Sequence, residues 1–196
     1  MSGFNISNFK SNGLVFGGAR PTLFSVRLTK PLAFTLDNTS MSKFEFTCRG
    51  SQLPPATVGT IEIPYFGRNI KLAGDRTFPD WNVTVMNDED FLVRSMFESW
   101  SNALNSLESN VRAAGTSEQY KADLIVSQYG KEGDTIRQYR IIGAFPSAID
   151  PIDLNWDSQN QIEQFGVTFS YDYWLPEGTE TANPYLGAAQ ASPAGQ

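Results

Sequence analysis

Two groups of acidic residues are the first candidates for chemistry in this chain of 196 residues. The run Asp88–Asp90 is wholly acidic, and Asp150, Asp153 and Asp157 follow at looser spacing. Such carboxylates can bind cations or act as an acid and base pair. The first group, however, lies at the N-terminus of a predicted helix, where negative charge stabilises the helix dipole. The second lacks the ligand spacing and central glycine of a calcium loop. We therefore assign neither group to a metal site.

The rest of the composition excludes further kinds of catalytic and binding site. The sequence has no histidine, which excludes a Ser-His-Asp triad, a histidine general base and a histidine metal ligand. Its single cysteine, Cys48, cannot form an internal disulfide, and we expect it to be a buried structural thiol. No glycine-rich loop has a phosphate-binding pattern. Arg68, Lys71 and Arg76 are expected to pair with acids of the same or a neighbouring chain. We predict no catalytic residue, cofactor or metal.

Charge is divided unevenly along the chain. Residues 1–140 hold all 15 basic residues and 14 acidic ones, whereas residues 141–196 hold seven acids and no Lys or Arg. An acidic, solvated surface that aids solubility is one interpretation. The other is a face that must not adhere to a polyanion, because binding DNA needs the opposite charge.

Alternation of apolar and polar residues predicts a mainly β protein. The predicted strands are Thr22–Thr29, Lys43–Cys48, Thr60–Phe66, Trp81–Val85, Lys121–Tyr129, Thr135–Phe145 and Gln161–Trp174. Pro64 places the third at an edge or a bulge. Gly130–Asp134 is predicted to be a hairpin loop. Together these strands predict an antiparallel β-barrel or sandwich.

One stretch departs from this pattern, because its apolar residues recur at helical spacing. We predict a flanking helix at about residues 88–111, capped by Asn87 or Asp88, with its apolar stripe packed on a sheet. Residues 1–20 are predicted to be an extended arm, 21–176 the folded domain, and 177–196 a low-complexity tail. Neighbouring subunits are expected to hold both ends. Neither a signal peptide nor a membrane-spanning stretch is expected.

Several ordered blocks of the sequence carry a resemblance to a known family. They are residues 49–68, 70–78, 81–85, 87–91, 97–102, 139–146 and 167–175. In this order they resemble the tail tube proteins of T4-like contractile-tailed phages, over most of residues 20–176. The resemblance implies a β-barrel or sandwich with a flanking helix, the fold that bacterial secretion tubes share.

The resemblance also implies a structural function and no enzyme activity. Six copies would pair their sheets into a ring, and rings would stack into a hollow tube inside a contractile sheath. A tape-measure protein and then DNA would occupy the lumen without sequence-specific binding. The expected partners are further copies of the chain, the sheath protein, and the baseplate and tail terminator proteins. The expected location is the virion tail, after assembly in the host cytoplasm and without a membrane anchor.

Within such a tube, two sets of residues are candidate contact sites. The strand Gln161–Trp174 is polar on one face, which is predicted to line the lumen through Gln164, Thr168, Ser170 and Asp172. The segment Gln52, Leu53, Pro54 and Pro55 is a candidate contact between rings. The competing interpretation of that segment is an ordinary turn stiffened by two prolines.

Three other functions remain open from the sequence. A tube-end component, such as a baseplate tube initiator or tail terminator, would share the fold but cap the tube. A bacterial secretion-tube protein would share both fold and assembly. A carbohydrate-binding or hydrolytic β-sandwich would instead use surface tryptophans and paired acids.

Overall fold

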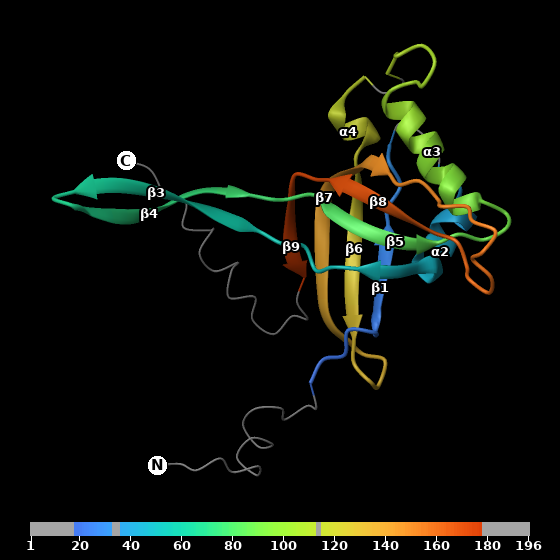
Figure 1. Ribbon diagram of the computed structural model, residues 1–196, viewed down its shortest axis with the longest axis horizontal. Helices are drawn as coiled ribbons and strands as arrows, with labels where there is room; N and C mark the ends of the chain where they lie inside the picture. The colour runs from blue at the N-terminus through green and yellow to red at the C-terminus, as the bar shows by residue number, and fades with distance from the viewer. Residues whose placement is uncertain (1–17, 33–35, 113–114, 178–196) are drawn as a thin grey trace, which may run out of the picture.

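The chain folds into two packed β-sheets, with helices at one end and a long hairpin projecting from the other (Figure 1). A computed structural model describes residues 18–32, 36–112 and 115–177. The strands in these ranges are β1 (Phe24–Leu28), β2 (Cys48–Ser51), β3 (Thr57–Tyr65), β4 (Arg68–Thr77), β5 (Trp81–Met86), β6 (Ala122–Tyr129), β7 (Thr135–Ile149), β8 (Gln164–Ser170) and β9 (Tyr173–Glu177). The helices are α2 (Asn38–Thr47), α3 (Leu92–Leu104) and α4 (Ser117–Tyr120).

Strand β7 belongs to both sheets. Its first part pairs with β6 and β9, and β6 also pairs with β1. Its last part, from Phe145, pairs with β8, and the order continues through β5 to β2. The change of sheet comes just after Gly143, whose φ of +70° favours glycine. The described strands form a sandwich, which is one of the two predicted architectures, and no closed barrel is found among them.

The core lies between the two sheets and under α3. Helix α3 buries Val93, Met96, Phe97 and Trp100. Phe97 and Trp100 both contact the ring of Phe169 on β8, and Phe97 meets Phe44 of α2 edge-on. The strands facing this cluster bury every second residue, as in Trp81, Val83 and Val85 of β5. The predicted packing of a helical stripe on a sheet is therefore confirmed.

The predicted strand Lys43–Cys48 is wrong, because this segment forms the end of α2. Asp37 caps the helix, its carboxylate accepting a hydrogen bond from the Ser40 backbone at 3.2 Å. Phe44 then lies one turn after the buried Ser40, whereas Phe46 points away and is 80% exposed. Alternation over six residues is too short to distinguish a strand from a helix with one buried aromatic residue.

The predicted helix 88–111 is too long at both ends. Helix α3 ends at Leu104, and the exposed Leu107 and Val111 do not continue its stripe. The Asn102 side chain accepts from the Leu107 backbone at 3.0 Å, so the chain turns away. At the other end neither Asn87 nor Asp88 caps the helix. Asn87 donates instead to Glu163 at 3.0 Å.

The predicted strand Gln161–Trp174 is two strands in different sheets. β8 ends at Ser170, and the backbone N–H of Asp172 donates to Ile142 of β7 at 3.1 Å. β9 then pairs with β7 in the other sheet. Most other predicted strands are confirmed within a few residues, as is the Gly130–Asp134 loop. The predicted terminal segments 1–20 and 177–196 lie almost wholly outside the described residues.

Candidate assembly surfaces

The β3–β4 hairpin stands clear of the sandwich (Figure 1). Its two strands pair in register from Tyr65 and Arg68 back to Thr57 and Thr77, with one irregularity near Gly59. The turn is Phe66–Gly67, with φ values of 43° and 79°. Two consecutive positive φ values match the twist that a tight hairpin needs. The predicted edge position of Pro64 is confirmed, because β3 pairs only with β4 in the described chain.

One face of this hairpin is apolar and in water. Residues opposite one another in an antiparallel pair share a face, and the shared apolar face consists of Ile61, Ile63, Tyr65, Ile70 and Leu72. Phe66 at the tip is 92% exposed. The other face is polar, with Lys71 at 3.5 Å from Glu62. A lone two-stranded sheet is marginally stable in water, so this apolar face has the character of an interface.

Three aromatic side chains hold the root of the hairpin on the sandwich. The indole N–H of Trp81 donates to the Gln52 carbonyl at 2.6 Å. The indole N–H of Trp174 donates to the Pro55 carbonyl at 3.0 Å, and the Tyr171 hydroxyl donates to the same atom at 3.4 Å. Burial raises the pKa of Tyr171, so its hydroxyl stays protonated as a donor. Sequence reasoning missed this role, because tryptophans in alternating strands indicate only core packing.

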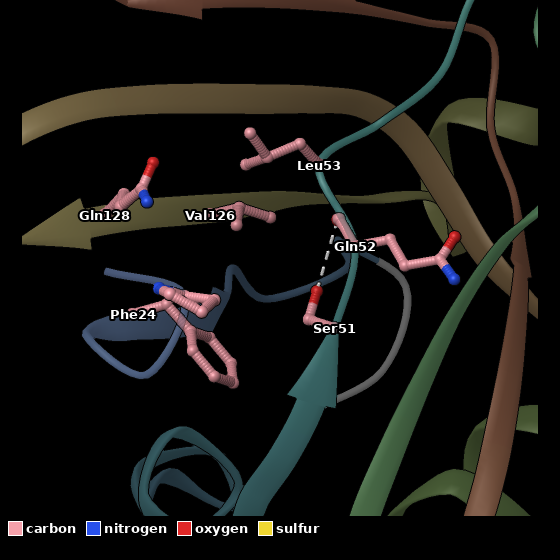
Figure 2. Close-up of a pocket in the computed structure, with 7 residues that line it drawn as sticks. Phe24, Ser51, Gln52, Leu53, Val126 and Gln128 are labelled. Atoms are coloured by element: carbon pink, nitrogen blue, oxygen red, sulfur yellow. Dashed lines mark hydrogen bonds between the residues drawn. The ribbon is translucent and has the colours of Figure 1, made fainter. Parts of the chain in front are cut away.

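The predicted contact segment Gln52–Pro55 is this same root. It runs from β2 into β3 without a turn, so the interpretation as an ordinary turn is wrong. Gln52 and Leu53 line a pocket of about 190 Å³ with Phe24 and Val126, shown in Figure 2. Pro54 is buried, while Gln52, Leu53 and Pro55 are exposed. That the segment Gln52–Pro55 contacts another ring stays a prediction.

The four predicted lumen residues do not share one strand. Gln164, Thr168 and Ser170 lie on β8, on the face opposite Phe165, Val167 and Phe169. Thr168 donates to Asn82 and Ser170 to Asp80, both at 2.7 Å.

Asp172 lies beyond that strand and pairs with Lys121 at 2.7 Å. Its place on a common strand face with the other three is therefore wrong. That the remaining face of β8 lines a lumen stays a prediction.

The charge division along the chain is only partly a division in space. Two acids of the C-terminal part pair with cations from the first part: Asp172 with Lys121, and Glu177 with Arg140 at 3.7 Å. The acids of the β7–β8 connection differ. Among the described residues no Lys or Arg forms an ion pair with Asp150, Asp153, Asp157 or Glu163. Among the described acids of the C-terminal part, those without an ion pair are therefore concentrated in residues 150–163.

The other acidic group joins two helices. Lys43 of α2 makes ion pairs with Asp88 and Asp90, just before α3. These hydrogen bonds raise the pKa of Lys43 and lower those of both aspartates. Asp90 also accepts from the Leu92 backbone at 3.1 Å, at the start of α3. The group thus stabilises a helix start, as predicted, and in addition anchors α2.

No arrangement suited to metal or thiol chemistry is found within the described ranges. No cluster of three or more Cys, Asp or Glu side chains there could hold a metal ion. Cys48 is buried as predicted, and burial raises its pKa to about 12, so the reactive thiolate does not form near neutral pH. Nor does any described helix have the length and apolar content to cross a membrane.

The comparison with known families matches most of the described chain. Residues 19–177 fit the family described as phage tail tube protein. This chain belongs to the phage tail tube protein family. It is 37% identical to the tail tube protein gp19 of Enterobacteria phage T4 over 157 residues, which cover 80% of this chain and 90% of gp19. The resemblance drawn from the ordered sequence blocks is therefore confirmed.

Solved structures share the fold at lower identity. A chain of the anti-feeding prophage baseplate superposes with a TM-score of 0.59 at 12% identity, covering 84% of this chain and 98% of that one. A chain from the sheath-tube complex of an extracellular contractile injection system gives 0.53 at 15% identity, covering 89% and 99%. The predicted fold class, mainly antiparallel β with a flanking helix, is confirmed, with α2 and α4 as additional helices.

Proposed function

We propose that this chain is the repeating structural subunit of a phage inner tail tube, with six copies in each ring and rings stacked along the tail. The observation that carries the proposal is the apolar face of the β3–β4 hairpin, which nothing in the described chain covers. A second copy is the natural cover for a surface that every copy presents. The edge strands β1, β2 and β9 each pair with a single strand and are available for pairing between copies.

The lumen of this tube is the conduit for DNA ejection and holds a tape-measure protein before that. The face of β8 with Gln164, Thr168 and Ser170 suits a lining, because uncharged side chains offer DNA phosphates no ion pair. The chain has no enzymatic role in this proposal. The number six rests on the family resemblance alone.

The partners of the tube follow from its position inside a contractile tail. We propose contacts with a contractile sheath outside, and with baseplate and terminator proteins at the two ends. Support comes from structural neighbours whose assemblies are a baseplate and a sheath-tube complex. The location is the virion tail, after assembly in the host cytoplasm.

A tube-end ring is the second candidate, because the baseplate neighbour has this fold too. The two differ in copy number. A tube body needs many identical rings in each virion, and an end component needs a single ring.

Electron microscopy of the purified protein tests the proposal. Stacked rings or tubes of uniform diameter are expected, and image averaging gives the number of copies in a ring. Isolated single rings under all conditions would favour the tube-end candidate. A protein that stays monomeric at high concentration, alone and with sheath protein, would rule out both.

A further inference from the structure

The direction in which the β3–β4 hairpin projects depends on contacts at its root (Figure 1). Every residue of β3 is exposed, as is every residue of β4 except Gly74, and within the described ranges the two strands pair only with one another. Two legs lead into the hairpin, residues 52–56 before β3 and residues 78–80 after β4. At about 3.3 Å per residue β3 is about 30 Å long, so a rotation of about 10° at the root moves the tip by about 5 Å.

The leg before β3 is held by the β8–β9 crossover, residues 170–174, where the chain leaves one sheet for the other. Both contacts meet at one backbone atom, the Pro55 carbonyl oxygen. It accepts a hydrogen bond from the Trp174 indole at 3.0 Å and another from the Tyr171 hydroxyl at 3.4 Å. The position of this leg therefore follows the position of the crossover.

The leg after β4 is held by the same crossover. The ring of Tyr171 packs on that of Phe78, with centroids 6.1 Å apart. One residue earlier, the Ser170 hydroxyl donates to the Asp80 carboxylate at 2.7 Å. Tyr171 thus contacts both legs at once, so a shift of the crossover changes the angle of the whole hairpin.

The middle of the crossover is anchored on its other side, at the bend of β7. The Asp172 backbone N–H donates to the Ile142 carbonyl at 3.1 Å. Both carboxylate oxygens of Asp172 accept from Nζ of Lys121 at 2.7 Å. Lys121 directly precedes β6, and a Cβ added at Gly143 would clash with the same carboxylate. The ion pair therefore fixes the crossover to the sandwich and lies apart from both legs.

The position of this ion pair matters more than its strength. Exposed ion pairs contribute little to global stability. Asp172, however, adjoins Tyr171 and lies two positions before Trp174, so it sits between the two side chains that hold Pro55. A small displacement there is enlarged along the length of the hairpin. An effect on the direction of the hairpin can therefore be separated from an effect on folding.

We propose that Lys121 and Asp172 are positioning residues of the β3–β4 hairpin: by fixing the crossover, their ion pair sets the angle between the hairpin and the sandwich. The inference rests on the proposed function only for its consequence in a tube. Identical copies make identical contacts when the hairpin has one direction, and less conformational entropy is lost on docking. The angle itself belongs to a single copy and is tested there.

The distance between two spin labels, measured by pulsed electron paramagnetic resonance, reports this angle in the full-length, unassembled chain. One label is attached near the tip through Asn69→Cys and the other in the β6–β7 loop through Lys131→Cys, both at exposed positions. Cys48 stays unlabelled, because it is buried and its pKa of about 12 prevents formation of the thiolate. An excess of unlabelled chain leaves only label pairs within one copy.

Lys121→Met keeps the apolar stem and removes the charge, and it should broaden the distance distribution at least about twofold. Asp172→Asn should do the same, and the double variant should add nothing, because either change already breaks the pair. The matched control is Arg27→Met, which removes the exposed Arg27–Glu45 pair between β1 and α2 and should leave the distribution unchanged. All four should melt within about 4 °C of the unmodified chain.

A direct release of the root provides the reference. Trp174→Phe combined with Tyr171→Phe removes both donors to Pro55 and shows the width that a free root gives. If this variant broadens the distribution while Lys121→Met and Asp172→Asn do not, the proposed role of the ion pair is overturned.

Other results count against the inference in different ways. Equal broadening by Arg27→Met would show that loss of any surface ion pair has this effect. A fall in melting temperature of Lys121→Met far beyond that of Arg27→Met would assign the pair to folding instead of positioning. None of these measurements needs a tube, so the inference can fail while the proposed function stands. A chain that shows the expected broadening but forms neither rings nor tubes would sink the proposed function alone.

Discussion

The sandwich and the β3–β4 hairpin use the same sequence pattern with opposite results. In β5 and β8 every second residue is apolar and buried. In β3 the residues Ile61, Ile63 and Tyr65 alternate in the same way, yet every residue of that strand is exposed. The alternation indicates that one face is to be covered, and it does not say by what. In the sandwich the cover is the same chain, and at the hairpin we propose that it is another copy.

The largest expected effect is in the sandwich. Trp100→Ala should lower the free energy of unfolding by about 3–5 kcal/mol, because the side chain is fully buried against Phe97 and Phe169. Phe66→Ala at the hairpin tip should change it by less than about 0.5 kcal/mol. Urea denaturation measures both. Comparable losses would mean that the hairpin is part of the folded core.

Substitution of one glycine in the sandwich and one in the hairpin compares the two regions through backbone strain. Gly143→Ala should lower the free energy of unfolding by about 1–3 kcal/mol, because its φ is positive and the new Cβ would clash with a carboxylate oxygen of Asp172. Lys121 holds both oxygens of that carboxylate at 2.7 Å, which limits its movement.

Gly67→Ala is the matched control, with a similar φ and no atom within 4 Å of the new Cβ. Its strain is confined to the hairpin turn, so global unfolding should change much less. Equal shifts of the two melting temperatures would show that the close contact at Gly143 has no consequence.

Substitutions on the apolar face of the β3–β4 hairpin should impair assembly and leave the stability of the fold unchanged. The double change Ile61→Ser and Leu72→Ser removes a cross-strand apolar pair that is about half exposed on each side. The free energy of unfolding should stay within about 0.5 kcal/mol of the original. Tube formation, followed by sedimentation and electron microscopy, should be lost. Normal tubes from this variant would remove the main support for the proposed function.

The root of the hairpin should show a smaller effect on both properties. Trp174→Phe keeps an aromatic ring on the sheet but removes the donor to the Pro55 carbonyl. One lost hydrogen bond should cost about 0.5–1.5 kcal/mol. The freer root should also slow assembly, because more conformational entropy is lost on docking. Tyr171→Phe removes a longer bond and should have the weaker effect in the same measurements.

The smallest expected effect is the pH dependence of the α2–α3 link. Hydrogen bonds from Lys43 lower the pKa values of Asp88 and Asp90. Their contribution is therefore present above the pKa of an unfolded aspartate, about 3.9, and is lost as the pH falls through the lower folded values. At pH 6 the melting temperature of Lys43→Met should be lower than that of the unmodified chain. The difference between the two melting temperatures should disappear towards pH 2. A gap that widens in acid would contradict this link.

The local elements that could be read from the sequence are those whose pattern is long or unambiguous. Strands β5 and β6 alternate over most of their length, and the Gly130–Asp134 loop has turn residues at its ends. The end of α2 imitates a strand because Lys43–Cys48 spans too few residues to fix the period. The segment 161–174 reads as one strand because alternation continues through Tyr171 and Asp172, although the hydrogen-bond partner changes there.

The candidate surfaces were harder to predict, because they depend on relations between distant segments. The sequence indicated that Gln52–Pro55 is a candidate contact segment. It did not indicate that Trp81 and Trp174, on other strands, donate hydrogen bonds to the carbonyls of this segment. The charge division suggested one acidic region, yet Asp172 is neutralised by Lys121, 51 positions away. The exposure of Trp156 could not be predicted from the sequence either, since burial is a property of the fold.

The continuity of β7 has a mechanical consequence. Two sheets joined only by side-chain packing can slide over one another when a load is applied along one of them. Here residues 135–149 run through both sheets as one strand, so part of any load passes from sheet to sheet along covalent bonds. The bend at Gly143 is then the hinge point at which such a load would concentrate, and the Asp172–Lys121 pair braces it from outside.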